Sequence, residues 1–126
     1  MTEKTKGQLE SEISAAITRF EKEHLGRGPK EARTFIIEDM ILIRLKSILT
    51  PAEEQLAGVT EGAQLIKQVR RRLIESSRPL LEKIIREITQ TDVLSLHTDI
   101  STRTGERIFV LHLNKNLEAE FDPDKE

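Results

Sequence analysis

The sequence contains no cysteine, tryptophan or tyrosine, and only four of its 126 residues are phenylalanine. Without cysteine the chain can form no disulfide, thiol nucleophile or thiolate metal site, which suits a reducing cytoplasm. Few aromatic rings also argue against binding single-stranded nucleic acid, because such binding uses aromatic side chains as stacking platforms for the bases. We therefore expect a cytoplasmic protein that binds no nucleic acid.

Long apolar segments are absent as well. The N-terminal stretch MTEKTKGQLESEI has no apolar signal core, and no apolar run approaches the ~20 residues needed to cross a bilayer. The formal net charge is −2, so no global field attracts the chain to nucleic acid or anionic lipid. With 37% hydrophobic and 33% charged residues, the composition is typical of one globular domain that does not span a membrane.

Apolar spacing predicts a helix followed by a β-hairpin in the first third of the chain. Apolar residues recur every three or four positions from Leu9 to His24, which is typical of an amphipathic helix. Branched residues then dominate Ala32–Glu38 and Ile41–Ile48, with Glu38-Asp39 as the expected tight turn. The middle of this hairpin is apolar on both faces, so both faces are expected to be covered.

The central segment predicts a short helix and a long one. Thr50 is placed to cap the first helix, Pro51 fits its first position, and Glu53 can bond back to the Thr50 amide. A second helix should start at Thr60 and carry a long apolar stripe. Pro79 lies inside that stripe, so we expect a kink or a break nearby.

The last third predicts a second hairpin, Val93–Asp99 and Arg107–Leu113, joined by a loop that contains glycine. The expected order is therefore α-β-β-α-α-β-β. The simplest way to pack these elements is an α+β fold, in which the four strands form one antiparallel sheet and the helices cover one of its faces. We expect one domain over residues 1–113 and an acidic, flexible tail over residues 114–126.

The stretch Gly26-Arg27-Gly28-Pro29 resembles a phosphate-binding loop in composition but not in context. Such loops precede a helix, whose free amides point at the anion, whereas this stretch follows a helix and precedes a strand. We interpret Gly26, Gly28 and Pro29 as a structural corner. An anion site formed by the side chains of Arg27, Lys30 and Arg33 remains the alternative.

The second candidate is the basic run Lys67-Gln68-Val69-Arg70-Arg71-Arg72. Its charges could face phosphates, lipid head groups or an acidic partner. At 100° per residue, however, Arg70, Arg71 and Arg72 cannot share one face of a helix. We favour a solvated, salt-bridged surface, with Arg70 and Arg71 as possible members of an anion site.

The third candidate is one face of the second hairpin. Strand alternation places His97 and Asp99 on the same face, with His112 as a diagonal neighbour across the turn. Two histidines and an aspartate could hold a metal or exchange protons. No fixed metal-ligand spacing accompanies them, so we expect a packing face and neither a metal nor another cofactor.

The sequence carries no nucleophile elbow, no HExxH motif and no paired-carboxylate signature, so we expect no enzymatic activity. If helices cover one face of the sheet, the other apolar face of the first hairpin stays open. We expect that face, with Ile36, Met40 and Leu42, to form an interface, most simply in a homodimer.

Three segments together resemble the MpsC family, a former domain of unknown function. They are HLGRGPKEARTFIIEDMILIRLKSILTPAEEQL, QVRRRLIESSRPLLEKII and VLSLHTDISTRTGERIFVLHL. The resemblance covers roughly residues 7–113. It implies a bacterial protein linked to a sodium-translocating, membrane-potential-generating system that is also discussed with bicarbonate supply, and it supplies no catalytic residues.

Two hypotheses follow from these observations. In the first, the chain is a non-enzymatic accessory or regulatory protein that docks, as a homodimer, on membrane transport subunits. In the second, it is a small-anion or nucleotide-binding sensor that uses Arg27, Lys30 and Arg33 with Arg70 or Arg71.

Overall fold

A computed structural model describes residues 4–121 of the chain. The elements are α1 (Lys6–His24), β1 (Glu31–Ile37), β2 (Met40–Lys46), α2 (Pro51–Leu56), α3 (Thr60–Thr89), β3 (Val93–Ser101), β4 (Glu106–Leu113) and the 3₁₀-helix η1 (Glu118–Phe121). This order confirms the α+β fold class expected from the sequence.

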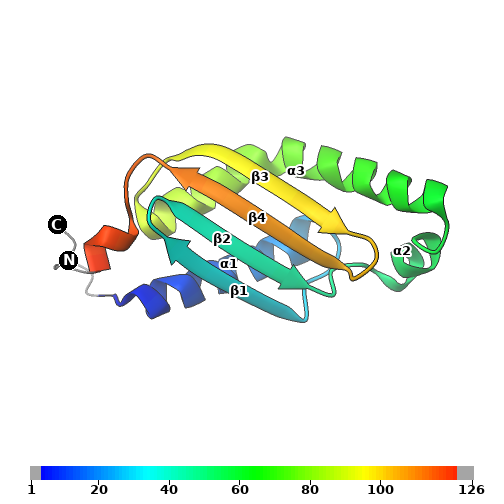
Figure 1. The fold of residues 1–126 in the computed structure, drawn as a ribbon, viewed down its shortest axis with the longest axis horizontal. Coiled ribbons are helices and arrows are strands. Elements are labelled where there is room, and N and C mark those ends of the chain that lie inside the picture. The colour runs from blue at the N-terminus through cyan, green and yellow to red at the C-terminus, as the bar shows by residue number, and fades with distance from the viewer. Residues whose placement is uncertain (1–3, 122–126) are drawn as a thin grey trace.

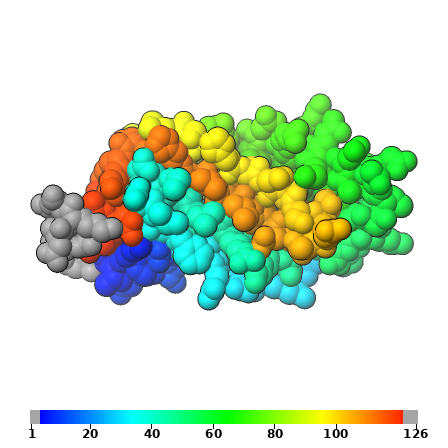
Figure 2. All heavy atoms as spheres, in the orientation of Figure 1, coloured from blue at the N-terminus to red at the C-terminus, as the bar shows by residue number. Residues whose placement is uncertain are grey.

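The four strands form one antiparallel sheet in the order β1-β2-β4-β3. The helices α1 and α3 lie behind the sheet in Figure 1, and the opposite face is turned toward the viewer. In the space-filling view of the same orientation, strand residues form the central surface (Figure 2). The expected packing, with helices on one face, is confirmed.

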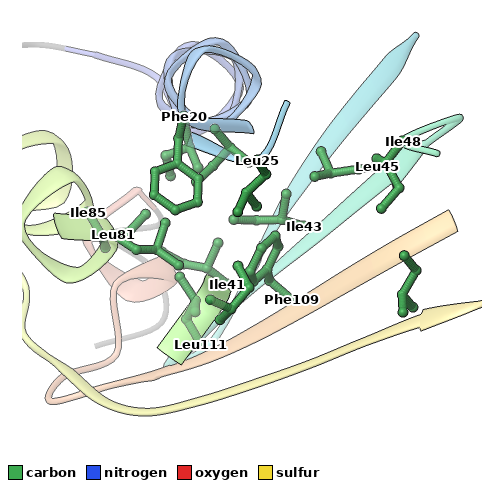
Figure 3. Packing of buried hydrophobic residues seen from close by; sticks show 14 of the residues in the cluster. Phe20, Leu25, Ile41, Ile43, Leu45, Ile48, Leu81, Ile85, Phe109 and Leu111 are labelled. Atoms are coloured by element: carbon green, nitrogen blue, oxygen red, sulfur yellow. The ribbon is translucent and has the colours of Figure 1, made fainter. Parts of the chain in front are cut away.

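The core lies between the sheet and the two long helices. The apolar stripe of α1 faces alternate residues of β2 and β4, as helix and strand periodicities require (Figure 3). Each buried aliphatic side chain of this kind stabilises the fold by about 1.5–3 kcal/mol. The fully buried side chains include Ile13, Ile17, Ile36, Ile41, Ile43, Leu45, Ile48, Ile85, Phe109 and Leu111.

Of the kink or break predicted near Pro79, the break does not occur, because α3 is one helix of 30 residues that contains Pro79. Proline removes the hydrogen bond to the carbonyl four residues earlier, which belongs to Glu75. Both residues are exposed, so water can satisfy that carbonyl. The helix continues because Leu81 and Ile85, beyond the proline, are buried in the core.

The predicted flexible tail from residue 114 is wrong for residues 114–121. Leu117 is buried in the core. The Glu118 carboxylate accepts hydrogen bonds from the Glu38 amide at 2.8 Å and from Lys6 Nζ at 2.7 Å. The domain therefore extends at least to Phe121, and the rest of the predicted tail lies outside the described residues.

Candidate functional site

Three charged side chains lie inside the protein: Glu21 of α1, Arg70 of α3 and Arg107 of β4. Their exposed fractions are 0%, 2% and 2%. Charged groups are buried at this level only when partners compensate for lost hydration. Together with the partly buried Glu53 of α2, they form what we call the buried ionic cluster.

Arg70 has a well-defined geometry in this cluster. Its Nη2 and Nε atoms donate to the two carboxylate oxygens of Glu53 at 2.6 and 3.0 Å, which is a bidentate pair. Nη2 also donates to the Ile48 carbonyl at 3.2 Å. The Glu53 carboxylate also accepts a hydrogen bond from the Thr50 amide at 2.9 Å, and the Thr50 hydroxyl accepts one from the Glu53 amide. These two bonds form the capping box of α2, so Arg70 links that capping box to α3.

Glu21 lies between the two arginines without a hydrogen bond to either. Its Oε1 is 3.9 Å from Arg70 Nη1, and its Oε2 is 3.8 Å from Arg107 Nε. Arg107 Nη1 donates to Thr98 Oγ1 at 3.0 Å, and its guanidinium stands 5.4 Å from the centre of the Phe109 ring. Within residues 4–121, five buried atoms lack a hydrogen-bond partner: Glu21 Oε1 and Oε2, Arg70 Nη1, and Arg107 Nε and Nη2.

Burial governs the electrostatics of Glu21 and Arg107. It raises the pKa of Glu21 above 4.5, although the charges of Arg107 and Arg70 oppose the rise. It lowers the pKa of the Arg107 guanidinium, against the attraction of Glu21. Burial also acts to raise the pKa of Glu53, but hydrogen bonds from Arg70 and Thr50 outweigh it and hold that pKa below 4.5.

The basic residues predicted as one anion site are not brought together. Arg27 Nη1 donates to the Leu49 carbonyl at 2.7 Å, and exposed Arg33 lies 3.5 Å from Glu31 on the sheet face opposite the helices. Lys30 is also exposed. The predicted solvated surface is wrong for Arg70, which is buried, and holds for the exposed Arg71.

Of the two glycines in the corner, only Gly26 has a backbone conformation that favours glycine. Gly26 has φ +101°, a conformation that side-chain-bearing residues rarely adopt, whereas Gly28 does not have a positive φ. A Cβ at Gly28 would meet Lys22 Cβ at 3.7 Å, an ordinary contact. The expectation that both glycines serve the backbone is therefore corrected for Gly28.

We expect Gly26→Ala to lower the free energy of unfolding by about 1–2 kcal/mol, because alanine is strained at this φ. Gly28→Ala is the matched control and should stay within about 0.5 kcal/mol of the wild type. Urea unfolding of both variants checks this, and equal losses would contradict the assignment of the turn to Gly26.

The histidine pair does not form a metal site. His97 is opposite Val110, and His112 is opposite Ser95, so the two histidines are diagonal neighbours as predicted. His112 Nε2 instead lies 3.1 Å from Asp39, while Asp99 lies 3.5 Å from Lys67. Within residues 4–121, no three histidine or acidic side chains are placed to hold a metal ion.

The sheet face away from the helices carries an apolar patch, which we call the open-face patch. Phe35 and Ile37 of β1 are 40% and 41% exposed, and they pair with Leu42 and Met40 of β2. Ile36 was predicted to share this face and does not, because it pairs with Ile41 on the core side and is fully buried. Val110 of β4 pairs with Leu42, which extends the patch across three strands.

The fold and these surfaces define a two-layer α+β domain with a buried ionic cluster and an apolar sheet face. Residues 5–115 match the model of the family described as the Na+-translocating membrane potential-generating system (MpsC). The chain is 50% identical over 119 residues to "Uncharacterized protein YbcI" of Bacillus subtilis (strain 168), which covers 94% of this chain and 96% of that protein. The chain belongs to the MpsC family.

No solved structure matches the chain. Over residues 4–121, each helix is too short or too polar to cross a bilayer.

Proposed function

We propose that this protein is a non-enzymatic accessory or regulatory component of a sodium-translocating, membrane-potential-generating system. It would act at the cytoplasmic side, as a homodimer that docks on membrane subunits. The family description supports the link to such a system. The observation that carries the mode of action, binding through a surface, is the open-face patch.

The open-face patch has the composition of an interface between two copies. Apolar side chains occupy its middle, and ion pairs occupy one end, where Arg44 pairs with Glu106 and Lys46 with Glu31. An apolar centre with a polar rim is typical of protein interfaces. Even the whole sheet face, with four strands about 4.8 Å apart and about seven residues long, has a footprint of only roughly 450 Å². That is small for a stable interface, so we expect exchange between monomer and dimer at micromolar concentration.

Phe35→Glu tests the dimer. A carboxylate in the middle of the patch would have to lose its hydration on association, so the variant should stay monomeric. Leu65→Glu is the matched control, because Leu65 is 50% exposed on α3, away from the sheet's open face, and should leave association unchanged. Sedimentation velocity at micromolar concentration distinguishes the two. A wild-type chain that sediments only as a 14.4 kDa monomer would refute the dimer.

The docking step has its own test. An affinity-tagged chain, purified from gently solubilised cells, should retain membrane transport subunits, and Phe35→Glu shows whether that binding needs the dimer. Recovery of the tagged chain without such subunits would remove the transport role and leave the dimer standing.

A further inference from the structure

A small cavity lies beside the buried ionic cluster, between α3 and the edge strand β3. Its volume is about 40 Å³. Polar and charged side chains dominate its lining, which consists of Lys67, Arg70, Arg71, Thr98, Asp99, Ile100 and Arg107. Four of these side chains are cationic and one is a carboxylate, so the lining as a whole is positive.

The two arginines are held in place from outside the cavity. Glu53 binds Arg70 with two hydrogen bonds, and Glu21 lies within 4 Å of both guanidinium groups, yet neither carboxylate lines the cavity. Thr98, which does line it, accepts one Arg107 hydrogen bond. Guanidinium groups supported in this way are pre-organised, so a ligand does not have to order them.

Both arginines also have N–H groups that donate no hydrogen bond to the described residues. Arg107 Nη2 is buried and has no hydrogen-bond partner among residues 4–121. A buried donor without a partner is unfavourable, so an acceptor that reaches Arg107 Nη2 from the cavity would be bound the more strongly. The planar fork of arginine matches two oxygens of one carboxylate or phosphate group.

The mouth of the cavity leads to a larger, shallow groove. Half-buried Lys67 and exposed Asp99, 3.5 Å apart, line both spaces. The groove has a volume of about 660 Å³ and is also lined by Ser101 at the end of β3 and by Thr102 and Arg103 of the β3–β4 loop. A ligand with an anionic end in the cavity would therefore have room for its body outside.

We propose that this cavity is an oxyanion-binding pocket, in which Arg107, Arg70, Lys67 and Arg71 take a small free oxyanion or the carboxylate or phosphate end of a small metabolite. This site replaces the anion site expected from the sequence. It keeps Arg70 and Arg71 but substitutes Lys67 and Arg107 for Arg27, Lys30 and Arg33. The pocket stands independently of the proposed dimer, which uses other residues.

Thermal unfolding of the full chain tests the pocket. Sodium phosphate, sodium acetate and glycerol 1-phosphate are titrated separately at an ionic strength held constant with sodium chloride. We expect a saturable rise in Tm of at least ~2 °C with one or more of the oxyanions, because a ligand that binds only the native state stabilises it. A larger rise with the phosphate ester than with inorganic phosphate would assign the groove to the body of the ligand, and equal rises would assign a free ion.

The variants Lys67→Ala and Arg71→Ala should each weaken the titration at least threefold, since each removes one cation from the lining. The matched control is Arg72→Ala, which removes the next charge along α3 from a residue outside the lining and should leave the titration unchanged. The absence of a saturable rise with all three oxyanions would overturn the proposal. So would a titration that Lys67→Ala and Arg71→Ala leave as it is.

Discussion

Glu21→Ala should lower the free energy of unfolding by about 3–5 kcal/mol, the loss typical of breaking a buried ion pair. The reason is electrostatic. Glu21 is the carboxylate between Arg70 and Arg107, and it is fully buried. Its removal leaves Arg107 without a carboxylate within 4 Å among the described residues, and leaves two buried cations without the carboxylate between them.

Urea unfolding checks this prediction, with Glu82→Ala as the matched control. Glu82 pairs with Arg78 on the surface of α3 at 2.8 Å, and exposed pairs of this kind contribute about 0–1 kcal/mol. A loss below about 1 kcal/mol for Glu21→Ala would contradict the prediction, since it would mean that water hydrates the cluster well enough to replace the carboxylate.

A triple substitution separates the cost of an unpaired charge from the value of the cluster itself. Replacing Glu21, Arg70 and Arg107 together by leucine or methionine removes every buried charge of the trio. Such replacements are often neutral or stabilising, because the desolvation of the ions is no longer required. If the triple variant is at least as stable as Glu21→Ala but loses the oxyanion response, the cluster serves binding more than folding.

The order of the elements was predictable because apolar residues keep strict periods along this chain. The face assignment of Ile36 failed for a geometric reason. Across the two-residue turn at Glu38 and Asp39, an even-numbered residue of β1 pairs with an odd-numbered residue of β2. Ile36 therefore shares a face with Ile41, while Met40 and Leu42 lie on the other face. The turn length alone contains this information.

The buried charges also left a signal in the sequence that composition alone does not reveal. Glu21 lies four residues after Ile17 in a series of buried positions on α1. Arg70 lies midway between Ile66 and Ile74 on the buried stripe of α3. A charged residue at a helix position that the apolar period assigns to the core is expected to be buried. Both residues could therefore have been predicted as buried charges from the sequence.

Their meeting could not have been predicted. Arg107 comes from β4 and reaches Glu21 only because the sheet places β4 next to β2 and under the helices. Local periods fix which side of an element a residue occupies, but not which residue of another element it faces. The cavity beside Arg107 follows from the same tertiary arrangement, which is why sequence patterns grouped Arg27, Lys30 and Arg33 instead.

The structure joins α2 to α3 at two points that depend on each other. The bidentate pair between Arg70 and Glu53 holds α2 against α3 from one side. On the other side, Gly62 in the first turn of α3 closely approaches Leu56 at the end of α2. An added Cβ on Gly62 would lie 2.1 Å from the Leu56 carbonyl oxygen and 2.8 Å from Leu56 Cγ.

Gly62→Ala should therefore destabilise the protein at or above the upper end of the roughly 1–3 kcal/mol typical of overpacking. Helix propensity alone predicts the opposite sign, a gain of up to about 1 kcal/mol for alanine over glycine. The clash prevails because backbone must move, and the Arg70–Glu53 pair resists a shift of α2. Gly7→Ala in α1 is the matched control, since a Cβ there meets nothing within 4 Å, and it should be neutral or stabilising.

Urea unfolding of the two glycine variants, together with amide hydrogen exchange of α2, decides whether the link is rigid. The expected result is a large loss of stability for Gly62→Ala, with faster exchange in α2 because its contact with α3 is forced apart. A neutral Gly62→Ala would contradict the prediction, since α2 could then move away at little cost. In that case Glu53 could not hold Arg70 in place, and the pre-organisation of the oxyanion pocket would rest on Glu21 and Thr98 alone.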